Sequence, residues 1–67
     1  MKVAVNGKEE IIDQEISLID FLDSKGLELE RLVIEYNQQV IQKKEWDKII
    51  LKDGDVLEIL RFVGGGG

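Results

Sequence analysis

The chain has 67 residues, with 14 acidic and 9 basic side chains and a formal net charge of −5. It is long enough for one small domain, which leaves no room for a deep catalytic cleft beside a core. The absence of cysteine and histidine excludes disulfides, thiolate metal sites, thiol nucleophiles and the commonest general base. The acidic balance argues against nucleic-acid binding, which needs Lys and Arg, and favours a basic protein partner.

The first predicted element is a β-hairpin. Residues 2–5 alternate in polarity, and the Asn6-Gly7 pair follows them directly. Asn-Gly is a strong signal for a type I′ turn, because both central residues of that turn need positive φ. Residues 8–12 are therefore predicted to be the returning strand.

A short helix is predicted to begin at Ser17. Its hydroxyl can accept a hydrogen bond from the amide of Asp20, as in a capping box. Leu18 and Leu22, with Phe21 between them, form one apolar stripe at helical spacing. Gly26 supplies the left-handed residue that ends the helix.

The second half of the chain is predicted to hold three strands and one helical turn. In order these are a strand over 32–36, a turn at Asn37-Gln38, a short strand over 39–42, a helical turn over 43–48, a turn at Asp53-Gly54 and a last strand over 55–63. The helical turn is polar except for Trp46, which we expect to lie against the body of the domain.

This order of elements predicts one α+β domain over residues 1–63, with no repeat, linker or second domain. A mixed sheet with one main helix across one face is the compact solution. The first and last strands are the most apolar, so we expect them in the middle of the sheet. Leu18 and Leu22 are predicted to be buried against four strand residues, namely Val3, Val5, Leu57 and Ile59.

The last strand has two different faces. Leu57 and Ile59 point to one side, which we assign to the helix. Glu58 marks the other side as the one that meets water, because carboxylates are rarely buried unpaired. Leu60 and Phe62 share that side and lie close to the end of the chain. Glu58, Leu60 and Phe62 are therefore the candidate residues for docking a partner.

Four glycines, Gly64, Gly65, Gly66 and Gly67, close the chain. Glycine loses the most conformational entropy on ordering, so this segment is predicted to be a flexible tail. A tail without side chains is narrow enough to thread a channel in a partner and to present the Gly67 carboxylate there. A fraying end, a cloning remnant and a truncated linker are the structural alternatives.

Several segments together resemble a known family. They are the opening MKVAVNGK, the NQQVI stretch, Trp46 at its spacing after that stretch, and the final LKDGDVLEILRFVGG. As an ordered set they resemble the ubiquitin-like (β-grasp) sulfur carriers of thiamine biosynthesis, the ThiS type, over essentially the whole chain. The resemblance implies a β-grasp fold and a carrier that is not itself an enzyme.

The resemblance also implies the partners and the chemistry. A ThiF-type adenylating enzyme would transfer AMP from ATP to the Gly67 carboxylate. A persulfide donor such as cysteine desulfurase would then convert the terminus to a thiocarboxylate, and thiazole synthase of the ThiG type would accept the sulfur. The chain itself has no phosphate-binding loop and no base, so ATP is used by the partner and this chain binds no cofactor.

Three alternatives stay open at this point. They are a sulfur carrier of molybdopterin synthesis, a ubiquitin-like modifier that joins Gly67 to a lysine, and an interaction domain with an inert tail. Neither Glu9-Glu10 nor the Glu28 and Glu30 pair has the spacing of a calcium loop, so no metal is expected. No apolar run is long enough to span a bilayer, and a strand begins without a signal peptide, so we expect a cytoplasmic monomer without membrane contact.

Overall fold

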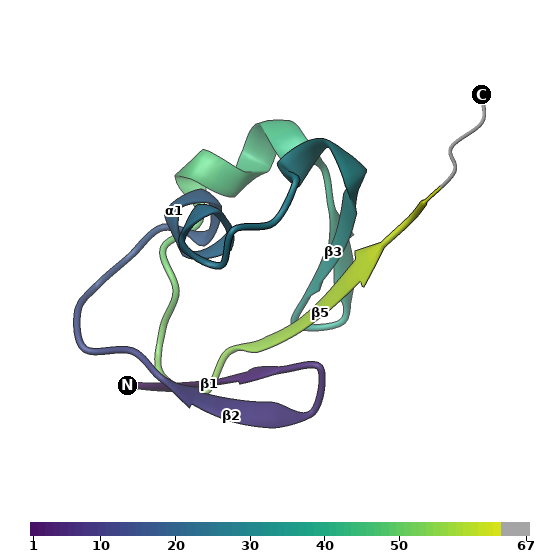
Figure 1. The fold of residues 1–67 in the computed structure, drawn as a ribbon. Helices are drawn as coiled ribbons and strands as arrows, with labels where there is room; N and C mark the ends of the chain where they lie inside the picture. The colour runs from purple at the N-terminus through teal and green to yellow at the C-terminus, as the bar shows by residue number, and fades with distance from the viewer. Residues whose placement is uncertain (64–67) are drawn as a thin grey trace.

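The structure is a computed structural model that describes residues 1–63, and the predicted tail over residues 64–67 lies outside the described residues. Eight elements follow one another along the chain (Figure 1). They are β1 (Lys2–Val5), β2 (Lys8–Ile11), α1 (Leu18–Ser24), the 3-10 helix η1 (Leu29–Arg31), β3 (Leu32–Tyr36), β4 (Gln39–Ile41), the 3-10 helix η2 (Lys43–Lys48) and β5 (Val56–Arg61).

The five strands form one mixed sheet in the order β2-β1-β5-β3-β4. β5 pairs in parallel with β1 and antiparallel with β3, and the two outer pairs are antiparallel hairpins. Figure 1 shows α1 lying against one face of this sheet, with η2 beside the helix. The predicted α+β architecture is confirmed, and the first and last strands do lie next to each other inside the sheet.

Both hairpins turn through left-handed residues. Asn6 and Gly7 have φ values of 51° and 83°, as the Asn-Gly pair predicts. Asn37 and Gln38 have φ values of 49° and 74°, which is uncommon for residues with a side chain. The tight β3–β4 connection thus holds a glutamine in a conformation that glycine adopts more readily.

The helix begins and ends where its capping residues predict. The Ser17 hydroxyl accepts a hydrogen bond from the Asp20 amide at 3.2 Å, and Gly26 follows the last turn with φ of 73°. The apolar stripe of α1 enters the core. The core residues, all less than 9% exposed, are Val3, Val5, Ile12, Leu18, Phe21, Leu22, Leu32, Ile34, Trp46, Leu51 and Leu57.

Trp46 is the largest side chain in this core and is only 1% exposed. The polar turn η2 places it there, as predicted, and its indole Nε1 donates a hydrogen bond to the Ile41 carbonyl at 3.3 Å. That bond satisfies the one polar atom that the ring would otherwise bury. Ile59, predicted to be buried with the helix, is only partly buried at the margin of the core.

The boundaries of three strands differ from the predicted ones, and one short helix is additional. The last strand covers Val56–Arg61 rather than residues 55–63. Asp55 stays in the preceding loop, where its carboxylate accepts hydrogen bonds from the Tyr36 hydroxyl and the Lys52 amide. β2 and β4 each end one residue earlier than predicted, at Ile11 and Ile41. The short helix η1 was not predicted, since its three residues carry no capping signal.

Leu22 provides the test of this packing. It is fully buried on α1, so we expect Leu22→Ala to lower the free energy of unfolding by about 2–5 kcal/mol through lost contacts and a residual cavity. Urea titration followed by tryptophan fluorescence measures this. Leu60→Ala is the matched control, because Leu60 is 56% exposed and the same truncation should cost less than about 1 kcal/mol there. Equal losses for the two variants would contradict the assigned core.

Candidate partner-docking face

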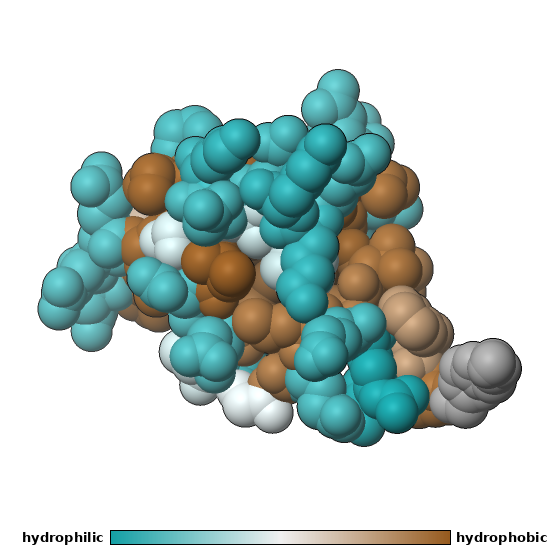
Figure 2. Space-filling view, turned by 90° about the horizontal axis from the view of Figure 1, so that it is seen from above, coloured by the Kyte–Doolittle hydropathy of each residue, from teal (hydrophilic) through white to brown (hydrophobic). Residues whose placement is uncertain are grey.

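The side of the sheet that faces away from α1 is unusually apolar. Its exposed large apolar side chains over β3, β4 and β5 are Val33 (37% exposed), Val40 (68%), Val56 (42%), Leu60 (56%) and Phe62 (48%). Together with Glu35 and Glu58 they are called the outer face below. Figure 2 shows apolar side chains, in brown, gathered on the side of the molecule where β5 ends. Exposed apolar side chains that gather on one face in this way are typical of protein–protein contact.

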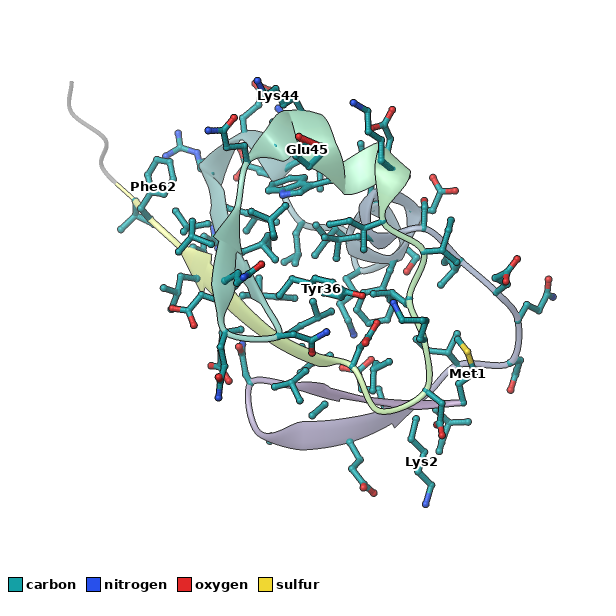
Figure 3. All side chains as sticks on the ribbon, turned by 180° about the vertical axis from the view of Figure 1, so that it is seen from behind. Met1, Lys2, Tyr36, Lys44, Glu45 and Phe62 are labelled. Carbon is teal, nitrogen blue, oxygen red and sulfur yellow. The ribbon has the colours of Figure 1, made fainter. Side chains whose placement is uncertain are left out.

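The three residues that the sequence singled out lie on this face. Glu58, Leu60 and Phe62 alternate along β5 and its extension, and all three are exposed. Figure 3 shows Phe62 at the far end of β5, and the residue is 48% exposed. No other element covers Leu60 or Phe62 in the described part of the chain. Their role in docking stays a prediction.

The strand register adds residues that sequence reasoning missed. Val33 lies opposite Leu60, and Glu35 lies opposite Glu58, in the β3–β5 ladder. Val40 of β4 in turn lies opposite Glu35. The alternation of β3 placed Val33 and Glu35 on one side of their strand. Only the pairing of β3 with β5 shows that this side joins the surface that carries Leu60 and Phe62.

Two asparagine side chains hold β5 in place. At one edge of β5 the Asn6 side chain takes the place of a neighbouring strand. Its Oδ1 accepts a hydrogen bond from the Ile59 amide at 2.7 Å, and its Nδ2 donates one to the Ile59 carbonyl at 3.2 Å. Asn37 does the same at the other edge, where its Oδ1 accepts from the Val56 amide at 2.8 Å. Backbone pairing then continues to Phe62, whose amide donates to the Arg31 carbonyl at 3.0 Å. The strand is therefore fixed up to the residue two positions before the glycines.

Asp55 anchors the start of β5. It is 5% exposed, and its carboxylate accepts from the Tyr36 hydroxyl at 2.8 Å, from the Lys52 amide at 2.8 Å and from Asn37 Nδ2 at 3.2 Å. Tyr36 reaches this carboxylate from within the body of the domain (Figure 3). These bonds tie the loop before β5 to the turn between β3 and β4.

The Asp55 network also changes two pKa values. Burial by itself raises the pKa of Asp55. The pKa nevertheless lies below its ordinary value, because the carboxylate accepts hydrogen bonds from Lys52, Asn37 and Tyr36 and lies near the Lys52 ammonium. The hydrogen bond of Lys52 Nζ to the Tyr36 hydroxyl, at 3.1 Å, is the main reason why the pKa of Lys52 is raised. Both shifts follow from the contacts that hold this loop together.

The described body offers little reactive chemistry. Within residues 1–63, no three acidic side chains gather in a way that could hold a metal ion. No helix in this part of the chain is long and apolar enough to cross a membrane. The predicted reactive residue Gly67, and the tail residues Gly64, Gly65 and Gly66, lie outside the described residues. What the structure does present is a group of exposed apolar side chains on the strand that precedes them and on its neighbours.

A five-stranded mixed sheet in this order, with one helix across it, defines a β-grasp domain of the carrier and modifier class. The crystal structure of the thiamine biosynthesis protein ThiS from Geobacter metallireducens has the same fold, with a TM-score of 0.84 and 32% identity over 98% of this chain and 100% of that one. Residues 1–66 match the ThiS family. The chain belongs to this family of sulfur carriers of thiamine biosynthesis, which are small carriers rather than catalysts.

Two further relatives show in which kinds of protein a similar domain occurs. The sulfur carrier protein ThiS of Bacillus subtilis is 38% identical over 63 residues, which cover 92% of this chain and 96% of that protein. The thiazole synthase of Paramagnetospirillum magneticum is 30% identical over 66 residues, which cover 98% of this chain. The chain spans only 20% of the length of that synthase. A domain like this one therefore occurs both by itself and within a longer polypeptide.

Asp55 gives a pH-dependent test of the loop network. A carboxyl group whose folded pKa is lowered stabilises the fold above its unfolded pKa, near 3.9, and this contribution disappears as pH falls through the folded value. We expect Asp55→Asn to cost about 1–3 kcal/mol at pH 7. The variant should also lose less stability than the parent below about pH 5.

Urea titrations at pH 7, 5 and 3 measure both effects. Asp47→Asn is the control, because Asp47 is exposed on η2 and the same change of charge should there alter stability by less than about 0.5 kcal/mol. Parallel pH profiles for the parent chain and Asp55→Asn would show that Asp55 does not contribute to acid unfolding.

Proposed function

We propose that this chain delivers sulfur to thiazole synthase as a thiocarboxylate on Gly67. The observation that carries the proposal is the position of β5 in a domain of the ThiS family. The strand is held on both edges up to Phe62 and ends beside the exposed outer face. A partner that docks on the outer face therefore has the last residues of the chain within reach of its own active site.

The chemistry begins with activation of a carboxylate. A carboxylate is a poor acyl donor, because its leaving group would be oxide. In the first step a Gly67 oxygen attacks the α-phosphorus of ATP, pyrophosphate leaves, and an acyl-adenylate forms. The adenylating partner supplies the phosphate-binding site and the base, since this chain has no histidine, no cysteine and no glycine-rich phosphate loop.

Sulfur enters in the second step. The terminal sulfur of a persulfide on a donor protein such as cysteine desulfurase attacks the acyl carbon, and AMP leaves. A thiol then cleaves the sulfur–sulfur bond, is oxidised to a disulfide, and releases the thiocarboxylate. The described body contributes no group to these bonds, and its part is to bind each partner and to present the end of the chain.

Thiazole synthase is the acceptor that the relatives support. The thiazole synthases of Paramagnetospirillum magneticum and Magnetococcus marinus each match 98% of this chain over 20% of their own length. In those proteins a domain like this one and the rest of a thiazole synthase belong to one polypeptide. Such a connection raises the effective concentration of the two parts for each other.

The reaction is tested by intact-mass measurement. The chain is incubated with ATP, the adenylating enzyme of the same organism and a persulfide donor. We expect the mass gain that corresponds to replacement of one oxygen by sulfur. A chain that lacks Gly66 and Gly67 is the control and should gain nothing. A mass increase from attachment to a lysine would instead identify a modifier, and an unchanged mass would identify an interaction domain with an inert tail.

The tail is tested by adding one tryptophan after Gly67. The added side chain should block entry to a narrow site and abolish thiocarboxylate formation. The thermal midpoint should change little, because no residue of the core is altered. Addition of one glycine is the matched control for tail length. Undiminished thiocarboxylate on the tryptophan variant would show that the tail does not thread a narrow site.

Phe62 tests the docking role of the outer face. Because its ring is 48% exposed, Phe62→Ala should lower the free energy of unfolding by less than about 1 kcal/mol. The same change should weaken binding of the adenylating enzyme about tenfold or more if Phe62 is an aromatic anchor of the interface.

Calorimetric titration measures the affinity of the adenylating enzyme for each variant. Ile11→Ala is the control, because Ile11 is 66% exposed on β2, an edge strand that β1 separates from β5. Similar losses of affinity for Phe62→Ala and Ile11→Ala would show that the interface lies elsewhere.

A further inference from the structure

A pair of like charges lies in the middle of the outer face. Glu35 of β3 and Glu58 of β5 occupy directly opposite positions in the antiparallel ladder. Two backbone hydrogen bonds show which opposite residues of this ladder are hydrogen-bonded pairs. They run from the Asn37 amide to the Val56 carbonyl and from the Phe62 amide to the Arg31 carbonyl. They make Glu35 and Glu58 a hydrogen-bonded pair, in which the Cα atoms are about 5.5 Å apart.

Within residues 1–63, no cation forms an ion pair with Glu35 or Glu58. The ion pairs of residues 1–63 are Lys25–Glu10, Arg31–Glu28, Lys48–Glu45 and Arg61–Glu28. None of them includes Glu35 or Glu58. Like charges directly opposite each other on a sheet destabilise it. The free domain therefore keeps an unfavourable pair that the folding of residues 1–63 does not explain.

The neighbours of the pair on β3, β4 and β5 are mostly apolar, whereas the Asn6 side chain flanks the other edge of β5. Val33 and Leu60 form the next row on the same side of the ladder, and Val40 lies beside Glu35 on β4. A partner that covers these apolar side chains also removes water from the two carboxylates. Burial of an unpaired charge is strongly unfavourable. The partner surface must therefore bring a cation to the point that faces Glu35 and Glu58.

We propose that the partner that covers the outer face inserts an arginine between Glu35 and Glu58, within an otherwise apolar contact. The inference rests on the proposed function, in which this face docks the adenylating enzyme. A guanidinium has five N–H donors in a planar fork and can bond two carboxylates at once, which a lysine ammonium does less well. Glu35 thereby becomes a specificity residue of the interface.

A second copy of this chain does not fit the same surface. Two outer faces packed together would bring four carboxylates into one apolar contact, in a chain whose net charge is already −5. Juxtaposed like charges of this kind suppress a wrong partner. The pair thus favours a basic partner and opposes self-association through the exposed apolar residues.

The variant Glu35→Lys separates recognition from folding. It places an opposite charge across from Glu58, so the thermal midpoint of the free chain should rise or stay unchanged. It also repels the proposed arginine, so the affinity for the purified adenylating enzyme of the same organism should fall about tenfold or more. A residue with a purely structural role would change stability and affinity in the same direction.

Two further variants complete the test. Glu35→Gln keeps the shape of the side chain and should weaken binding less than Glu35→Lys does. Glu9→Lys is the matched control, because Glu9 is an exposed acid on the same side of the sheet that lies opposite Ala4. It makes the same change in net charge and should alter the affinity less than about threefold, as a distant surface charge does through screened attraction.

Calorimetric titrations at about 50 and 300 mM salt measure these affinities. We expect a smaller salt dependence for Glu35→Lys than for the parent chain. Equal affinities for the parent, Glu35→Lys and Glu35→Gln would overturn the arginine contact. Thiocarboxylate formation by the parent would then still support the proposed function. Failure of the parent chain to bind the adenylating enzyme at all would overturn both, and the mass measurement would then show no sulfur.

Discussion

The pairing of β5 with β1 on one side and β3 on the other is the constraint on which the rest of this domain depends. The strand follows a loop that is anchored by the buried Asp55 carboxylate. Asn6 and Asn37 then bond its backbone from opposite edges. Leu57, fully buried, joins the strand to the core beneath α1. Because the chain continues from β5 directly towards its last residues, the position of this one strand determines where those residues begin.

The same strand also separates the core from the proposed docking face. Leu57 and Ile59 point towards the helix, whereas Glu58, Leu60 and Phe62 point to the outer face. Substitutions on one side of β5 should therefore act on stability, and substitutions on the other side should act on binding. This separation suits the proposed function, in which a carrier of the ThiS family stays folded while its partners bind and release it. It also explains how the outer face can keep the unfavourable Glu35 and Glu58 pair.

Much of the fold could be predicted from the sequence because its signals are local. The Asn6-Gly7 turn, the Ser17 cap and the Gly26 stop each depend on the conformation of a few neighbouring residues. Alternation along a strand likewise predicts which side chains share a face, so the exposure of Leu60 and Phe62 could be expected. The resemblance to sulfur carriers came from the order of such local pieces together with the final glycines.

The sequence by itself determined the strands and the main helix, the helix-facing stripe and the absence of thiol and imidazole chemistry, since these follow from composition and short-range pattern. Only the tertiary structure decided which strands are neighbours and in which register. Asn6 meets Ile59 across 53 positions of sequence, and Asn37 meets Val56 across 19. The opposition of Glu35 to Glu58 arises in the same way. Such contacts depend on how separate strands pair in three dimensions, which alternation within either strand does not specify.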